Sequence, residues 1–440
     1  MTDIPDIPDI PDFPEGLHLL KRWQSGDAEA KQDMCTIFDA AIAGEFDANF
    51  AILAPTNAVH ASASVHMLAL SILHDLYGIE SAEYYKTIPE RYVRANLIAS
   101  RLLGIDKLYM TWALYAFTCE AMGQVMMYPD KFPPGSDPDK VLITRDTWQS
   151  LTTPDFNSGI PKIINDVLRV TERLTGMEPL LQISAPYSLA ADIYGQEPLL
   201  ENVVHEPDFV NELLNHLANQ VLSPWIDHFI GQFPNGWIEL SDASGSPFFI
   251  GPDNCKNMAI RSIKHMVDGK PWADRVFDAN YRGDYVTQAR KKNRGATRRR
   301  SSGAATTGGI DLSHLTDLKH SVCRDFIIRL EADKVPLSFY EEQAIKRGVP
   351  LTTGIGASQI DRNSIPDLDI AKQEIHETAG QFVAAIKQVS ENINLPEDNN
   401  VLEPWPSHVY FEDISNQSQF DMIEIIIQSV RDNGQFKGQD

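Results

Sequence analysis

The chain has 440 residues, 43% of them hydrophobic, and a formal net charge of -23. A chain of this length can bury a large core, and α/β barrels often reach it as one domain. The negative charge argues against nucleic acid as a general partner, because phosphate contacts need a basic face. Four scattered cysteines form no disulfide framework and suit a reducing compartment. They are Cys35, Cys119, Cys255 and Cys323.

The two ends of the chain differ in composition from the part between them. Residues 1–16 contain a Pro-Asp repeat, IPDIPDIPDFPEG, which predicts an extended, disordered tail because proline fixes φ and removes amide donors. Neither a signal peptide nor an apolar run long enough to cross a bilayer is evident. We therefore expect a cytoplasmic protein without a membrane partner. A single domain should span residues 17–433, and residues 434–440 should form a flexible C-terminus.

Apolar periodicity predicts alternating helices and strands along this domain. Helical spacing begins at Leu17 with LHLLKRWQ and DMCTIFDAAIAGEF, which indicates an N-terminal helical extension. Short apolar runs between helical segments predict buried parallel strands that close into a (β/α)₈ TIM barrel. We expect these strands at 50–54, 107–112, 180–184, 237–242, 275–280, 326–331, 349–354 and 408–413.

One internal segment, residues 287–310, differs in composition from the rest of the domain. Its glycine- and serine-rich sequence cannot pack a core, so it predicts a disordered basic insertion within the barrel. The insertion either binds a polyanionic cofactor or an acidic partner, or is a passive solvated loop. Its basic residues are Arg290, Lys291, Lys292, Arg294, Arg298, Arg299 and Arg300.

Three stretches together resemble the uroporphyrinogen decarboxylase superfamily. They are ISAPYSLAADIYGQEPLLENVVHEPDFVNELLNHL (183–217), GWIELSDASGSPFFIGPDNCKNMAIRSIKHMV (236–267) and FIIRLEADKVPLSFYEEQAIKRGVPLTTGIGASQIDRN (326–363). The likeness spans roughly residues 80–430. It implies the family's (β/α)₈ barrel and an enzyme.

Within that superfamily, FTCEAMG (117–123) is more similar to the methyltransferases than to the decarboxylases. The arginine-rich PVWxMRQAGRY segment of the true decarboxylases is absent, so decarboxylation of uroporphyrinogen is not expected. The methyltransferases that act on thiols carry a zinc site of His-x-Cys and a late cysteine. Here Asp278 and Asn280 stand at the pair's place, and no cysteine follows Cys323. We therefore assign no metal ligands and expect no zinc bound through thiolates.

Candidate site residues follow from the rule that barrel active sites lie at the carboxyl ends of the strands. Each has a structural alternative, such as a turn cap for Asp242 or an ion pair for Arg282. We predict catalytic roles for Asp242, Asp278, Glu331 and His60, with His66 a weaker candidate. We predict substrate-binding roles for Tyr187, Asn280, Arg282 and Ser244.

The first function hypothesis is a methyltransferase acting on a small methylated substrate. The resemblance implies a corrinoid, carried by a partner protein, or tetrahydrofolate as methyl acceptor. The second hypothesis is a decarboxylase or other lyase acting on a small carboxylate substrate, with Arg282 holding the carboxylate. The third is a non-catalytic binding barrel. The sequence leaves a homodimer and a bound metal open.

The basic insertion gives a first testable prediction. If it attracts an acidic partner or a polyglutamylated folate, salt should screen this attraction over about 8–10 Å. Deleting residues 289–309 should then weaken partner binding at low ionic strength and leave the fold intact. Binding or turnover of the deletion variant, measured against salt concentration, checks this. An unchanged salt dependence would make the loop a passive insertion.

Overall fold

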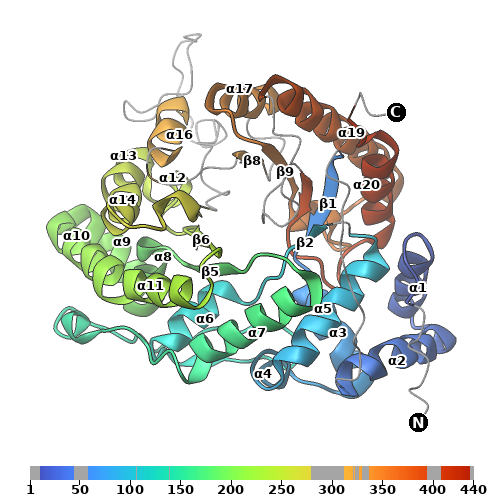
Figure 1. Ribbon diagram of the computed structural model, residues 1–440, viewed down its shortest axis with the longest axis horizontal. Coiled ribbons are helices and arrows are strands. Elements are labelled where there is room, and N and C mark those ends of the chain that lie inside the picture. Colours follow the sequence, from blue (N-terminus) through green and yellow to red (C-terminus); the bar gives the residue numbers. More distant parts are fainter. Residues whose placement is uncertain are drawn as a thin grey trace.

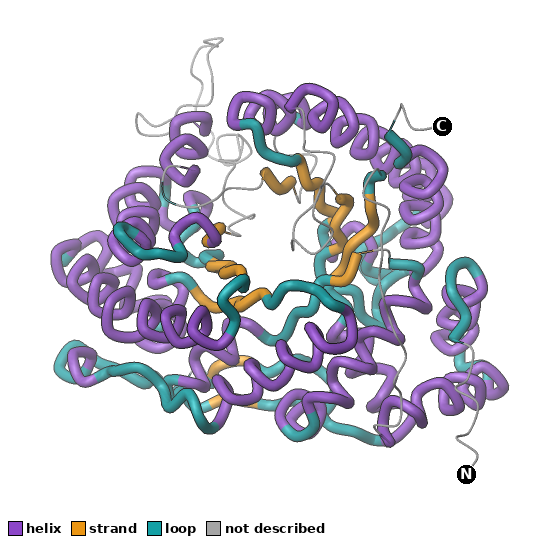
Figure 2. The backbone as a smooth tube through the Cα atoms, viewed as in Figure 1, coloured by secondary structure: helices purple, strands orange, loops and turns teal. Residues whose placement is uncertain are grey.

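A computed structural model describes residues 10–43, 58–105, 107–137, 139–278, 312–320, 322, 327–329, 336–393 and 408–436. Strands gather in the middle of the molecule and helices surround them (Figure 1). The same arrangement is visible in the backbone tube, where helices form the outer ring (Figure 2). The described chain is therefore a mixed helix and sheet structure with helices outside.

Two parallel sheets make up the centre. One has the strand order β2-β1-β10-β9-β8, and the other has the order β5-β6-β7. The strands are β1 (His60–Ala63), β2 (Lys107–Leu108), β5 (Leu180–Ser184), β6 (Trp237–Ser241), β7 (Val276–Asp278), β8 (Ile327–Arg329), β9 (Leu351–Ile355) and β10 (His408–Phe411). A short antiparallel pair, β3 (Met126–Met127) and β4 (Gly135–Ser136), lies outside these sheets.

Helices connect the parallel strands and cover them. In chain order, the described α-helices before β7 are α1 (Glu15–Gln24), α2 (Ala28–Ala43), α3 (His66–Tyr77), α4 (Ser81–Lys86), α5 (Pro89–Leu103), α6 (Leu114–Ala121), α7 (Gly159–Thr175), α8 (Pro186–Tyr194), α9 (Gln196–His205), α10 (Pro207–His216), α11 (Ser223–Gln232), α12 (Pro247–Ile250), α13 (Pro252–Asn254) and α14 (Arg261–Val267). Those after β7 are α16 (Leu312–His320), α17 (Leu337–Arg347), α18 (Ala357–Ile360), α19 (Leu368–Ile393) and α20 (Phe420–Asn433).

The strands are buried on both faces, as parallel sheets covered by helices require. Every residue of β1, β5, β6, β9 and β10 is buried. Hydrophobic side chains from the helices complete the core. In α7, for example, Ile160, Ile164, Val167 and Leu168 recur at helical spacing and are buried.

The predicted strands agree with the structure along most of the chain. The runs at 180–184 and 237–242 correspond to β5 and β6, and the four later runs overlap β7, β8, β9 and β10. The run at 107–112 is a strand only at Lys107–Leu108, because residues 109–113 leave the sheet as a loop. Residues 50–54 lie outside the described residues.

The first described strand lies at His60–Ala63, where no strand was predicted. Its sequence, HASA, lacks the β-branched and aromatic side chains that indicate a strand from sequence. It forms because β10 and β2 pair with it on either side, with His60 opposite His408 and Ser62 opposite Lys107. Tertiary context, and not local propensity, determines this strand.

The N-terminal helical extension is present and fixed to the rest of the domain. Lys21 of α1 forms ion pairs with Asp421 and Glu424 of α20, and Trp23 Nε1 donates to Asp75 Oδ2 at 3.0 Å. Ile10 is buried in the core, before the predicted domain start at Leu17. The predicted 1–16 tail is therefore too long at its C-terminal end, because an apolar residue of the repeat packs against the domain.

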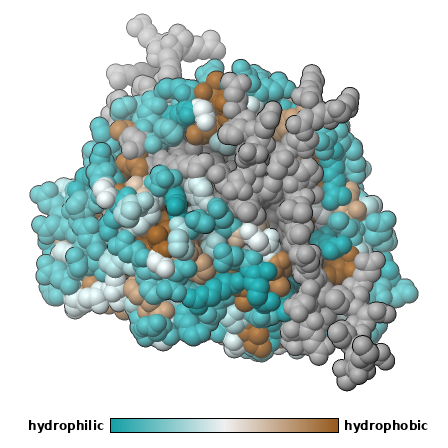
Figure 3. Space-filling view, in the orientation of Figure 1, coloured by the Kyte–Doolittle hydropathy of each residue, from teal (hydrophilic) through white to brown (hydrophobic). Residues whose placement is uncertain are grey.

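Closure into a barrel is not seen in the described chain. Within those residues, the strand pairings join neither β7 to β8 nor β2 to β5, so the two sheets remain separate. The described helices include none that is long and apolar enough to cross a membrane. The face shown in Figure 3 is mainly hydrophilic, with small separate hydrophobic patches.

A close approach at Gly16 gives a prediction about stability. A Cβ at Gly16 would lie 2.7 Å from the carbonyl oxygens of Leu102 and Pro11, which are backbone atoms and cannot rotate away. Gly16→Ala should lower the free energy of unfolding by about 1–3 kcal/mol. Gly380→Ala is the matched control, because Gly380 lies inside α19 with open space around it and should gain up to about 1 kcal/mol. Urea unfolding of both variants tests this, and equal behaviour would contradict it.

Candidate active site

A cavity of about 420 Å³ lies at the carboxyl ends of the parallel strands. Ser64 follows β1, Tyr109 and Thr111 follow β2, Ser241 ends β6, and Glu412 follows β10. The first turns of α3 and α6 complete the wall. This is the end of a parallel α/β structure at which ligands bind. The cavity therefore lies at the end of the strands to which the positional rule used on the sequence points.

Glu239 of β6 is the most buried carboxylate in the cavity wall. Its side chain accepts hydrogen bonds from Tyr109 Oη, from Gln182 Nε2 at 3.1 Å and from Ser241 Oγ at 3.2 Å. The residue is 3% exposed. Three hydrogen bonds from three different side chains hold this carboxyl group at a fixed place.

Glu412 and Asp413 bring two more carboxylates to the cavity, directly after β10. Asp413 has φ 47°, a left-handed conformation that non-glycine residues seldom adopt. The backbone on both sides is held, since Glu412 N donates to Ile355 O at 2.9 Å and Ile414 N donates to Ser64 O at 3.1 Å. Backbone strain of this kind concentrates at functional sites.

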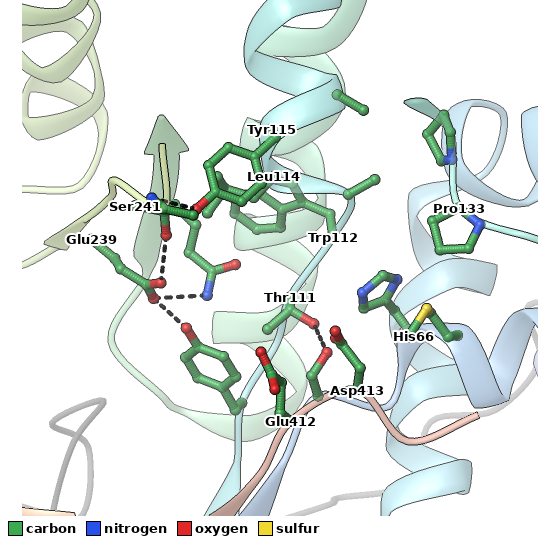
Figure 4. Close-up of a pocket in the computed structure, with 18 of the residues that line it drawn as sticks. His66, Thr111, Trp112, Leu114, Tyr115, Pro133, Glu239, Ser241, Glu412 and Asp413 are labelled. Carbon is green, nitrogen blue, oxygen red and sulfur yellow. Dashed lines mark hydrogen bonds between the residues drawn. The ribbon is translucent and has the colours of Figure 1, made fainter. Parts of the chain in front are cut away.

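Figure 4 shows Glu239 and Ser241 on one side of the cavity and His66 and Pro133 on the other. His66 Nδ1 shares a hydrogen bond of 2.6 Å with Tyr85 Oη. Desolvation by burial lowers the pKa of His66 to about 3, so its ring is neutral at pH 7. The described charged groups of the wall are then all carboxylates.

Aromatic rings form much of the remaining wall: Tyr109, Trp112, Tyr115 and Tyr410. The rings of Tyr109 and Tyr410 meet edge to face, with centroids 5.3 Å apart. Burial, and then the nearby charges of Asp413, Glu239 and Glu412, raise the pKa of Tyr410. Tyr410 therefore keeps its proton and lies within the field of all three carboxylates.

Two polar atoms of the wall are buried without a hydrogen-bond partner in the described part of the chain. They are Gln182 Oε1, an acceptor, and Trp112 Nε1, a donor. Buried polar atoms in native proteins nearly always have a partner. Their unmatched hydrogen-bonding capacity makes these two atoms candidate contacts for a ligand.

Asp242, the first predicted catalytic residue, does not line the cavity. Its Oδ1 accepts hydrogen bonds from Ser188 N at 3.1 Å, Ser188 Oγ at 2.9 Å and Gly245 N at 3.2 Å. Asp242 thus provides a hydrogen-bond acceptor for a backbone N–H group at the start of α8 and for one in the turn after β6. The geometry fits the structural alternative, a capping aspartate.

Three further described candidates, Tyr187, Ser244 and His60, also lie outside the cavity wall, whereas the weaker candidate His66 is part of it. Tyr187 is buried in α8, and its hydroxyl has no hydrogen-bond partner among the described residues. The backbone of Ser244 donates to Ser188 Oγ at 3.1 Å, within the same capping arrangement as Asp242. His60 is the first residue of β1, at the amino end of the strand and so at the opposite end from the cavity. It is a strand residue and not a residue of the following helix.

Four predicted residues cannot be placed by their side chains. Asp278 ends β7, where its backbone pairs with Leu240, but its side chain is not among those described. Asn280, Arg282, Glu331 and the 287–310 insertion lie outside the described residues.

No group of three His, Cys, Asp or Glu side chains in the described chain is arranged to hold a metal ion. Cys119 and Cys255 are buried outside the cavity wall. Burial raises the pKa of the Cys119 thiol, which disfavours the thiolate that zinc requires. Cys323 lies outside the described residues.

Some cavity residues that were not predicted could have been found from their position at the end of a predicted strand. Glu412 and Asp413 end the predicted strand HVYFED, where the carboxyl-end rule should have selected them. His66, predicted as a weaker candidate than His60, lines the cavity, whereas His60 does not. Glu239 stands inside WIELSD among apolar residues, so only the structure shows that its side chain lines the cavity.

Comparison with known proteins gives a likeness of fold. The sequence matches no family model and no curated protein. Among solved structures, a methyltransferase from Methanosarcina mazei superposes with a TM-score of 0.58 at 12% sequence identity. The match covers 85% of this chain and 94% of that one. The two chains share a fold. At that level the likeness agrees with the resemblance to the methyltransferase branch.

Substitutions at Asp242 distinguish a structural capping role from a catalytic role. Asp242→Ala should lower the free energy of unfolding by about 1–3 kcal/mol, because three buried donor groups lose their acceptor. Asp242→Asn keeps a side-chain oxygen and should cost much less. Thermal unfolding of the two variants measures the difference. Unchanged stability in both variants, with activity lost in both, would restore the catalytic assignment.

Proposed function

We propose that this protein is a methyltransferase acting on a small methylated substrate held in the cavity. The two parallel sheets then belong to one (β/α)₈ barrel of the uroporphyrinogen decarboxylase type. Eight parallel strands in chain order, with helices outside, support this proposal.

The observation that carries the proposal is the cavity at the carboxyl ends of β1, β2, β6 and β10. Its volume of about 420 Å³ lies within the usual range of small-molecule sites. The shared fold with a methyltransferase over most of both chains adds support. A neutral histidine and fixed carboxylates suit positioning of a substrate, which supplies much of the barrier reduction in a transfer reaction.

In the proposed reaction, the acceptor's electron pair forms the new bond to the methyl carbon, and the donor heteroatom keeps the electrons of the broken bond. Glu239, held by Tyr109, Gln182 and Ser241, orients the donor. His66 is neutral and bonded to Tyr85, so it serves as a fixed polar contact and not as a charged acid.

The acceptor is either a corrinoid on a partner protein or tetrahydrofolate. A corrinoid supplies a strong nucleophile when bound. The cavity is of a size for the small substrate alone, so a corrinoid partner would present its group at the cavity mouth. A cytoplasmic location and a homodimer belong to the same proposal.

The lyase alternative receives less support. It requires a cation to hold a substrate carboxylate, and Arg282 lies outside the described residues. The described acidic side chains of the cavity wall are Glu239, Glu412 and Asp413. A substrate carboxylate would carry a charge of the same sign as these groups. Like charges at close range repel.

A methyl-transfer assay tests the proposal. Purified protein is incubated with isotopically labelled methyl donors and either a reduced corrinoid or tetrahydrofolate, and the methylated acceptor is measured by mass spectrometry. We expect transfer to one acceptor, and Glu239→Gln should lower kcat/KM by about 10²-fold through loss of positioning.

Glu374→Gln is the matched control, because it removes the same charge from the exposed surface of α19. Labelled carbon dioxide released from small carboxylates without any acceptor, and no methylated acceptor, would favour the lyase.

A further inference from the structure

We propose that a second cavity binds a small oxyanion that carries two negative charges. This cavity has a volume of about 370 Å³, within the usual range of small-molecule sites. It lies between the end of α1, the start of α2, the second half of α3 and residues of three loops. It shares no lining residue with the cavity at the strand ends, so the proposal stands independently of the methyltransferase function.

Hydrogen bonds between its elements hold the walls of the second cavity in place. Trp23 Nε1 of α1 donates to Asp75 Oδ2 of α3 at 3.0 Å. Gln24 Nε2 donates to the carbonyl oxygen of Asn416 at 2.9 Å, which joins α1 to the loop after β10. Arg362 Nη2 donates to the same carbonyl oxygen at 3.1 Å. The cavity is therefore formed by fixed elements before any ligand binds, as small-molecule sites usually are.

The two carboxylates of this wall, Asp27 and Asp75, already have cationic partners. Asp27 accepts two backbone N–H bonds at the start of α2 and forms an ion pair with Arg22 at 2.7 Å. Asp75 forms an ion pair with Lys31 at 3.3 Å. The negative charges of the wall are thus matched without using its two remaining cations.

Those two cations are Lys131, between β3 and β4, and Arg362, between α18 and α19. Within the described part of the chain, neither has a carboxylate partner, and the ammonium group of Lys131 makes no hydrogen bond. Arg362 donates through Nη2 to Asn416 and Gln417, which leaves Nε and Nη1 for a ligand. An arginine binds a carboxylate or phosphate through two parallel N–H groups, and a lysine adds a point charge.

These two unmatched cations determine the charge of the ligand. The whole chain has a formal net charge of -23, so most of the molecule repels anions and this cavity is a local exception. One negative charge would leave one of the two cations unmatched, whereas two negative charges match both. The ligand class is therefore a doubly charged oxyanion, either a phosphate monoester or a dicarboxylate.

Direct binding to the full-length chain tests the proposal. Titration calorimetry at about pH 8 and constant ionic strength compares inorganic phosphate and succinate, which both carry two charges there, with acetate, which carries one. We expect at least one of the two dianions to bind at one molecule per chain, about tenfold or more tightly than acetate. Added salt should weaken this binding, because the attraction is screened over about 8–10 Å.

The two dianions distinguish the sources of the shared chemistry. Tighter binding of phosphate would assign the cavity to a phosphate-bearing ligand, and tighter binding of succinate would assign it to a dicarboxylate. Saturable binding of neither dianion, or binding of both no tighter than that of acetate, would overturn the proposal.

Two variants locate the bound anion. Lys131→Gln and Arg362→Gln each remove one of the unmatched cations from an exposed side chain, so both variants should keep the wild-type melting temperature. Each should weaken binding of the preferred dianion about tenfold. Lys264→Gln is the matched control, because it removes the same charge from the exposed surface of α14 and should leave binding unchanged. Wild-type affinity in both folded variants would place the anion elsewhere and refute the proposal.

Discussion

The buried carboxylate of Glu239 is the interaction on which the geometry of the cavity depends. It lies on β6, the middle strand of the β5-β6-β7 sheet. Its partner Tyr109 follows β2 of the other sheet, and its partner Gln182 belongs to β5. A polar group can stay buried at low cost only when hydrogen bonds replace those that it made to water. The same bonds that make burial of Glu239 tolerable therefore tie the sheets together across a gap without strand pairing.

This arrangement couples the stability of the domain to the chemistry of the cavity. Tyr109 and Gln182 each serve Glu239 on one side and line the cavity on the other. A substitution that breaks the network would leave the buried carboxyl group of Glu239 without its hydrogen-bond partners, which is costly in a core. Tyr109 and Gln182 therefore line the cavity and also stabilise the packing around Glu239.

Much of the fold could be predicted from the sequence, because the buried strands LLQIS and WIELSD are apolar runs bounded by helical segments. The strand HASA could not be predicted, because alanine and serine have low strand propensity. These residues form a strand only because they pair with β2 and β10. The candidate site divides in the same way. Asp242 lies at the carboxyl end of β6, as predicted. The role of a residue there depends on the direction of its side chain, and Asp242 Oδ1 accepts hydrogen bonds from Ser188 and Gly245. Glu412 and Asp413 also stand at the carboxyl end of a predicted strand, but the positional rule alone does not distinguish them from other polar residues at strand ends.

The left-handed backbone at Asp413 restricts what evolution can place there. Asparagine and glycine tolerate that conformation best, whereas β-branched and bulky side chains do not. Relatives that alternate freely among aspartate, asparagine and glycine would preserve only the turn after β10. Relatives that retain aspartate alone would preserve its charge as well. The residues found at this position in related sequences can therefore show whether the backbone turn alone is conserved, or the carboxylate as well.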